Sequence, residues 1–132
     1  MRKLTHSLSM TTLVLVAFIL ISSCKKKTED PVPTFTVTSA NVSLTGGGTG
    51  LQFFAKCTNN GVSMTNVTIT NPSSGVYTHK YNGASYIQNA SIPMQGTDTA
   101  YLKQTGTWKF NLVGSSSGGT AFAIDATVAI SK

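Results

Sequence analysis

The last third of the chain alternates between apolar and polar residues with the two-residue period of a β-strand. In both of its segments the apolar residues occupy every second position: Trp108, Phe110 and Leu112 in the first, and Phe122, Ile124, Ala126, Val128 and Ile130 in the second. A Ser/Gly-rich loop over residues 114–119 joins the two segments. This pattern predicts an antiparallel hairpin with one buried face. The second segment is long enough that we expect a bend or bulge near Ala126.

The same rhythm extends upstream to Thr34, and no stretch of this region has helical periodicity. Clusters of Gly, Asn, Ser and Pro recur at short intervals and predict turns. Pro93 interrupts one segment, so we expect it in an edge strand or at a bulge. The predicted strands cover residues 35–39, 41–44, 51–58, 64–70, 76–81, 85–88, 91–94, 107–113 and 120–130.

So many short strands predict an all-β fold, a single antiparallel β-sandwich of about seven to nine strands. Gly106-Thr-Trp-Lys-Phe110 and the closing hairpin resemble the C-terminal half of the Ig-like domains common in Bacteroidetes lipoproteins, which implies an Ig-like sandwich. The Cys…Trp…Cys pattern of true immunoglobulin domains is absent, because Cys57 has no partner and Trp108 follows it too late. A jelly roll or a small barrel is the alternative.

The N-terminus has a basic start and then an apolar run over residues 13–21. This run is shorter than the roughly 20 apolar residues of a bilayer-spanning helix. The small residues Ser22 and Ser23 follow it, then Cys24, then three lysines. The arrangement resembles a bacterial lipoprotein signal peptide with its lipobox. An uncleaved transmembrane anchor is the alternative.

The lipoprotein resemblance implies that residues 1–23 are removed and that Cys24 carries a diacylglyceryl thioether, with a further fatty acid such as palmitate on its new amino group. Two or three acyl chains anchor a protein stably, whereas one is marginal. We therefore expect a membrane partner and a place in the bacterial envelope, at the outer membrane, on its periplasmic or its surface face. Residues 24–33 would form a lipidated flexible tether, and residues 34–132 the sandwich domain.

Charge changes this picture little. The formal net charge is +6, and removal of residues 1–23 takes away Arg2 and Lys3 and leaves +4. Much of it lies in the lysines at positions 25–27, beside the membrane, where it favours anionic headgroups. The remaining lysines are scattered, so we expect no nucleic-acid partner.

Cys57 is the only cysteine left for the domain, so no intrachain disulfide can form. It shares one face of a predicted strand with Leu51, Phe53 and Ala55, and we expect it to be buried as a small apolar residue. A reactive thiol or an intermolecular bridge is the alternative.

Catalytic side chains are scarce in the domain, where Asp98 and Asp125 are the only carboxylates and His79 the only histidine. Gly114-Ser-Ser-Ser-Gly118 has the letters of a Gly-x-Ser-x-Gly elbow, but we interpret it as a flexible turn. There is no closely spaced His/Cys set for zinc, and no lysine of a phosphate loop after the glycine run at residues 46–50. We therefore expect no enzymatic activity, no metal and no cofactor. An enzyme or inhibitor domain is the less favoured alternative, and a cleft uniting the three residues would support it.

Tyr77, His79 and Tyr81 alternate on one face of a predicted strand, and Tyr86 follows the next turn. Aromatic rings on a sheet surface offer platforms for sugar rings or a partner protein. These four are the candidate ligand-binding residues of a non-enzymatic binding or structural module, and a carbohydrate-binding accessory lipoprotein is the alternative function. The competing interpretation is that the rings pack inward or cover the sheet edge.

Asp98-Thr99-Ala100 is similar to the Asp-Ser/Thr-small acceptor of the general O-glycosylation system of Bacteroidetes. The resemblance implies a glycan on Thr99. An ordinary turn is the alternative.

Overall fold

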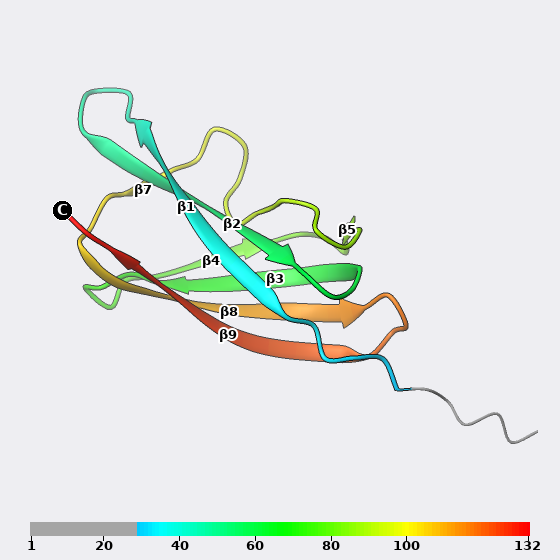
Figure 1. The fold of residues 1–132 in the computed structure, drawn as a ribbon. Coiled ribbons are helices and arrows are strands. Elements are labelled where there is room, and N and C mark those ends of the chain that lie inside the picture. The colour runs from blue at the N-terminus through cyan, green and yellow to red at the C-terminus, as the bar shows by residue number, and fades with distance from the viewer. Residues whose placement is uncertain (1–28) are drawn as a thin grey trace, which may run out of the picture.

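The computed structural model describes residues 29–132, so the predicted signal peptide and Cys24 lie outside the described residues. The described chain is all-β, with nine strands in two antiparallel sheets that pack together (Figure 1). This confirms the predicted antiparallel β-sandwich. In residues 29–132 there is no helix that is long and apolar enough to cross a membrane.

The first sheet contains four strands. It is built from β1 (Phe35–Ser43), β2 (Thr49–Cys57), β6 (Ile92–Pro93) and β7 (Tyr101–Leu102). β1 pairs with β2 along its whole length, with Ala40 opposite Gln52, so the two strands predicted over residues 35–44 are one. β6 and β7 pair with the other side of β2, which places Pro93 at the sheet edge, where a missing N–H is tolerated. β7 was not predicted.

The second sheet contains five strands. It is built from β4 (Val76–Lys80), β3 (Val62–Thr70), β8 (Gly106–Ser116) and β9 (Ala121–Ile130) in that order, with β5 (Ser85–Tyr86) also on β3. The predicted hairpin is β8–β9, whose register runs without a shift, so the bulge expected near Ala126 is wrong. The shift lies instead in β3, between Met64 and Asn66. It allows Met64 and Val67 both to be buried, although they are three positions apart and a regular strand would place them on opposite faces.

β8 extends beyond its predicted end and carries three residues that were assigned to a loop. Gly114 makes this extension feasible, because a Cβ at this position would overlap the carbonyl oxygen of Ser63 on β3. Without a side chain the two strands approach closely, and pairing continues to Ser116 opposite Val62. A glycine inside a strand thus marks a close backbone contact here.

The core lies between the two sheets. Phe53 of β2 packs against Trp108 and Phe110 of β8, with ring centroids 4.9 Å apart in both pairs. Trp108 has no exposed surface, and its Nε1 donates to the carbonyl oxygen of Gln104 at 3.0 Å. Cys57, the free cysteine of the described residues, is buried in the same core, as predicted.

Three loops lie together at the end of the sandwich where the chain enters the domain (Figure 1). We call this the entry end. It comprises the connections over residues 58–61, 87–91 and 117–120 together with the segment before β1. The turn between β1 and β2 lies at the opposite end of the sandwich (Figure 1).

Candidate functional site

The predicted ligand-binding residues lie along one side of the sandwich. Tyr77 and His79 are opposite Ile69 and Val67 of β3, which are both buried. Residues directly opposite each other in an antiparallel pair share a face of the sheet, so Tyr77 and His79 point toward its inner side. Because β4 is the edge strand, these rings close the side of the sandwich and do not stand on its outer surface.

Tyr81 is the most enclosed of the four. Its side chain is 7% exposed, and its hydroxyl donates to the carbonyl oxygen of Pro93 at 2.8 Å. His79 packs edge-on against it, with ring centroids 4.7 Å apart. Burial raises the pKa of Tyr81, and the neighbouring Tyr86 and Tyr101 raise it further. The ring face of Tyr81 is covered and does not form a stacking platform.

Tyr77 is 42% exposed and belongs to a separate contact. Its ring lies 5.0 Å from that of Tyr101 on β7, and its hydroxyl accepts a long hydrogen bond from Asn71 Nδ2 at 3.5 Å. Tyr101 is half-buried, its hydroxyl donates to the carbonyl oxygen of Met94, and burial, followed by the effect of Tyr77, raises its pKa. Tyr101 was missed in the sequence because a strand of two residues has no period.

Tyr86 connects this side of the molecule to the entry end. Its half-buried ring lies 6.2 Å from that of Tyr81, in an edge-on arrangement. The structure therefore brings His79, Tyr81 and Tyr86 together, whereas Tyr77 packs with Tyr101. Of the four predicted residues, only Tyr81 is buried, whereas Tyr77, His79 and Tyr86 each have surface that a ligand can reach.

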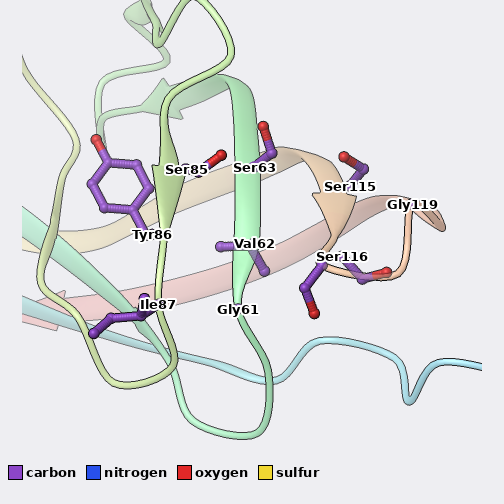
Figure 2. Close-up of a pocket in the computed structure, with 10 residues that line it drawn as sticks. Gly61, Val62, Ser63, Ser85, Tyr86, Ile87, Ser115, Ser116 and Gly119 are labelled. Atoms are coloured by element: carbon purple, nitrogen blue, oxygen red, sulfur yellow. The ribbon is translucent and has the colours of Figure 1, made fainter.

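A shallow groove of about 530 Å³ opens beside Tyr86 at the entry end (Figure 2). We call it the serine groove. Ser63 of β3 lies between Ser85 of β5 and Ser115 of β8 in register, so three hydroxyl groups form a row across three strands. The Ser63 hydroxyl donates to the carbonyl oxygen of Gly83 at 3.2 Å. This row was not predicted, because it exists only once the strands pair.

The floor of the serine groove is backbone, and one of its walls is apolar. Gly61 lies between Ile87 and Ser117, and a Cβ on it would approach the carbonyl oxygen of Tyr86 to 3.3 Å. Ile87 is 81% exposed, the largest value among the large exposed apolar side chains of the described residues. The groove thus combines an apolar wall with several hydroxyl groups.

The described part of the predicted tether lies against the entry end. The Ser116 hydroxyl donates to the Asp30 carboxylate at 2.7 Å. Asn59 holds the next residues, since its Nδ2 donates to the carbonyl oxygen of Val32 and its Oδ1 accepts from the Thr34 amide, both at 2.9 Å. We call these contacts the clasp. Residues 30–34 are therefore packed on the domain, in contrast to the expected mobile tether.

Pro33 and Gly118 both help the segment before β1 to pack closely on the domain. Pro33 is buried. A Cβ on Gly118 would overlap the carboxylate of Asp30, so the absence of a side chain there makes room for this acid.

The ionisable residues considered for catalysis lie in three separate places. Asp98 is exposed in the loop between β6 and β7, and Asp125 accepts from Asn111 Nδ2 at 2.7 Å between β8 and β9. His79 belongs to the aromatic contacts of β4. Within residues 29–132 no group of three or more His, Cys, Asp and Glu is placed to hold a metal ion.

Thr99 is exposed in the same loop as Asp98. Its amide donates to the carbonyl oxygen of Gly96 at 3.1 Å, and its carbonyl oxygen accepts from Gln52 Nε2 at 3.2 Å. The backbone of Thr99 is thus held in a turn while its side chain lies on the surface.

Comparison with known proteins adds no relative: no family model, no curated protein and no solved structure matches this chain.

Proposed function

We propose that this protein is a lipid-anchored lipoprotein of a Bacteroidetes-type cell envelope, and that its sandwich is a non-enzymatic binding or structural module. The observation that carries the proposal is the apolar run that ends in Ile21-Ser22-Ser23-Cys24 and is followed by three lysines. Two or three acyl chains on Cys24 would hold the protein on the membrane, at the outer membrane on its periplasmic or surface face.

The strand order supports the Ig-like part of the proposal. β1, β2 and β6 face β4, β3, β8 and β9, and successive strands repeatedly change from one sheet to the other. In Ig-like sandwiches the first, second, fourth and fifth strands form one sheet and the third, sixth and seventh form the other. This chain has the same division when β6 and β7 are taken as the fifth strand, except that β4 pairs with β3, as the added strand of variable-type domains does. Modules of this architecture often bind partners through the loops at one end.

The separation of Asp98, Asp125 and His79 favours a binding or structural role over an enzymatic one. General acid–base catalysis requires such groups within reach of one substrate atom. Asp98 lies in a loop next to the first sheet, and Asp125 lies on the last strand of the second.

Metabolic labelling with an alkyne fatty acid tests the lipid anchor. We expect label on the wild-type protein and on Cys57→Ala, and none on Cys24→Ala. Cys57→Ala is the matched control because it removes the other cysteine of the chain. Label that persists on Cys24→Ala, or a wild-type protein without label, would overturn the proposal.

Carbohydrate binding is the second candidate function, and the serine groove is the observation that favours it. The exposed Ile87 supplies apolar surface beside a row of hydroxyl groups, a combination that suits the faces and edges of a sugar ring. The half-buried Tyr86 also lines this groove, although its ring shares the inner face of the sheet with Val62. Glycan-array binding by the wild-type protein should be lost in Tyr86→Ala and retained in Tyr101→Phe, which keeps the aromatic packing. Equal binding by the wild type and Tyr86→Ala would exclude the groove, and the same comparison with Tyr77→Ala tests the exposed ring of β4.

A glycan on Thr99 is proposed from the Asp98-Thr99-Ala100 motif, and the exposure of Thr99 supports it. Mass spectrometry of the protein from its native host should find the modification in the wild type and in Thr97→Ala, but not in Thr99→Ala. Thr97 is the control because it is an exposed threonine of the same loop. An unmodified Thr99 would contradict the proposed glycosylation.

A further inference from the structure

The entry end is free of ionisable side chains in its three loops. Residues 58–61, 87–91 and 117–120 are Thr, Asn, Gly, Ile, Gln, Ala and Ser, and the exposed Ile87 stands among them. A surface that approaches lipid must shed water from its polar groups, and charged groups make this step most costly. These three loops therefore meet a low barrier to contact with a membrane interface, while the charged groups of the entry end, Glu29 and Asp30, lie in the segment that leads toward the anchor.

The clasp limits how far this end can lie from the anchor. Asp30 is bound to Ser116, so only residues 25–29 separate the domain from Cys24. Six Cα–Cα steps from Cys24 to Asp30 span at most about 20 Å when fully extended. A segment free as far as Pro33 would instead reach roughly 33 Å.

The clasp also determines which end of the sandwich is near the anchor. β1 leaves the entry end at Phe35 and reaches the far end at Ser43, a distance of roughly 27 Å at the usual rise of a strand. The turn that follows β1, with the exposed Thr45, therefore lies at the end of the domain away from the clasp. The two ends differ clearly in their distance from the lipid.

We infer that the entry end rests on the bilayer surface that holds the lipid of Cys24, with Ile87 inserted among the headgroups. The inference depends on the proposed lipid anchor. The hydroxyl groups of the serine groove would face the headgroups, where they can donate to phosphate or glycerol oxygens. The lysines at positions 25–27 lie in the connecting segment, and their charge suits a surface that contains anionic lipid. The domain would thus be held with its far end outward.

Fluorescence quenching by brominated lipids tests this orientation. The full-length lipidated protein is reconstituted into vesicles of phosphatidylcholine and phosphatidylglycerol, whose acyl chains are brominated near the headgroup in one set of vesicles. Ile87→Trp places an indole at the entry end, and Thr45→Trp places one at the far end as a matched control. Both positions are exposed, so neither substitution disturbs the core, and the buried Trp108 contributes the same background to both.

We expect the emission added by Ile87→Trp to shift to the blue and to lose most of its intensity in brominated vesicles. The emission added by Thr45→Trp should be unchanged. Unquenched Ile87→Trp emission on protein that floats with the vesicles would overturn the inference while the lipid anchor stands. Emission that is shielded from aqueous iodide but unaffected by bromine would assign the entry end to contact between two copies of this protein and overturn the inference. A protein that does not float with the vesicles would overturn the anchor and this inference together.

Discussion

Ser116 and Asp30 are 86 positions apart in the chain and are joined by a hydrogen bond of 2.7 Å. The same hydroxyl group accepts a hydrogen bond from the Thr120 amide at 3.1 Å. One buried serine therefore connects the segment before β1 to the turn between β8 and β9. This contact holds the segment before β1 against the domain, and it forms only when the turn between β8 and β9 is folded.

Ser116→Ala should lower the free energy of unfolding by about 1–2 kcal/mol, because the Asp30 carboxylate and the Thr120 amide both lose their partner. Urea unfolding followed by the fluorescence of the buried Trp108 measures the change. Ser115→Ala, one position away and partly exposed, should stay within about 0.5 kcal/mol of the wild type. Equal stabilities of the two variants would show that the Ser116 contacts contribute nothing.

Asn59→Ala should release the segment before β1. The substitution removes the acceptor of the Thr34 amide and the donor to Val32, so the Thr34 amide should exchange its hydrogen faster. These bonds are exposed, and the expected loss of stability is only about 0.5–1.5 kcal/mol. Asn60→Ala is the control, because Asn60 contacts Ser117 and not this segment. Unchanged Thr34 exchange in Asn59→Ala would contradict the role of the clasp.

Gly114→Ala should destabilise the domain by about 1–3 kcal/mol, since the added methyl group would meet the backbone oxygen of Ser63, which cannot move without disturbing β3. Gly61→Ala should cost markedly less, because the nearest atom to its new Cβ is 3.3 Å away. Thermal unfolding of both variants measures the difference. A Gly114→Ala variant as stable as Gly61→Ala would disprove the close approach of β3 and β8.

Stability should fall at alkaline pH because the pKa of Tyr81 is raised above the ordinary tyrosine value of 10.0, mainly by burial. Above pH 10 the unfolded chain loses this proton while the folded protein retains it, so the unfolded state binds fewer protons and unfolding becomes easier. The Tyr81 contribution is thus complete below pH 10 and is lost as the pH rises. Tyr81→Phe should flatten the alkaline decline, and Tyr77→Phe should retain it, since Tyr81 is still present. Parallel declines in the two variants would rule out Tyr81 as the cause.

Alternation along the sequence was sufficient to predict the strands that line the core and much of the core itself. Trp108 and Phe110 occupy alternate positions of one strand, and both are buried as predicted, because a half-buried strand shows its period in its own residues. β7 has two residues, too few for a period, and was missed, whereas β6 lies within the strand predicted over residues 91–94. A break was predicted at Ala40, but β1 continues through this residue in register with β2. The residues around Ala40 have no apolar alternation that would indicate a continuous strand.

The candidate site was less predictable because it depends on pairing between distant strands. Tyr77 and Tyr81 share one face in the sequence pattern, yet only Tyr81 lies beside Pro93 and is enclosed. The serine row requires the registers of β3 with β5 and with β8, which no local pattern contains. Residues 29–33 have the polar, proline-containing composition of a linker, and the side chains that hold them come from distant loops.

Mass spectrometry of the N-terminal peptide of the protein, purified from the membrane fraction, tests the lipid anchor most directly. We predict a mature chain that begins at Cys24, with a diacylglyceryl group on its sulfur and a further acyl chain on its amino group. A chain that retains residues 1–23, or an unmodified Cys24, would contradict the account.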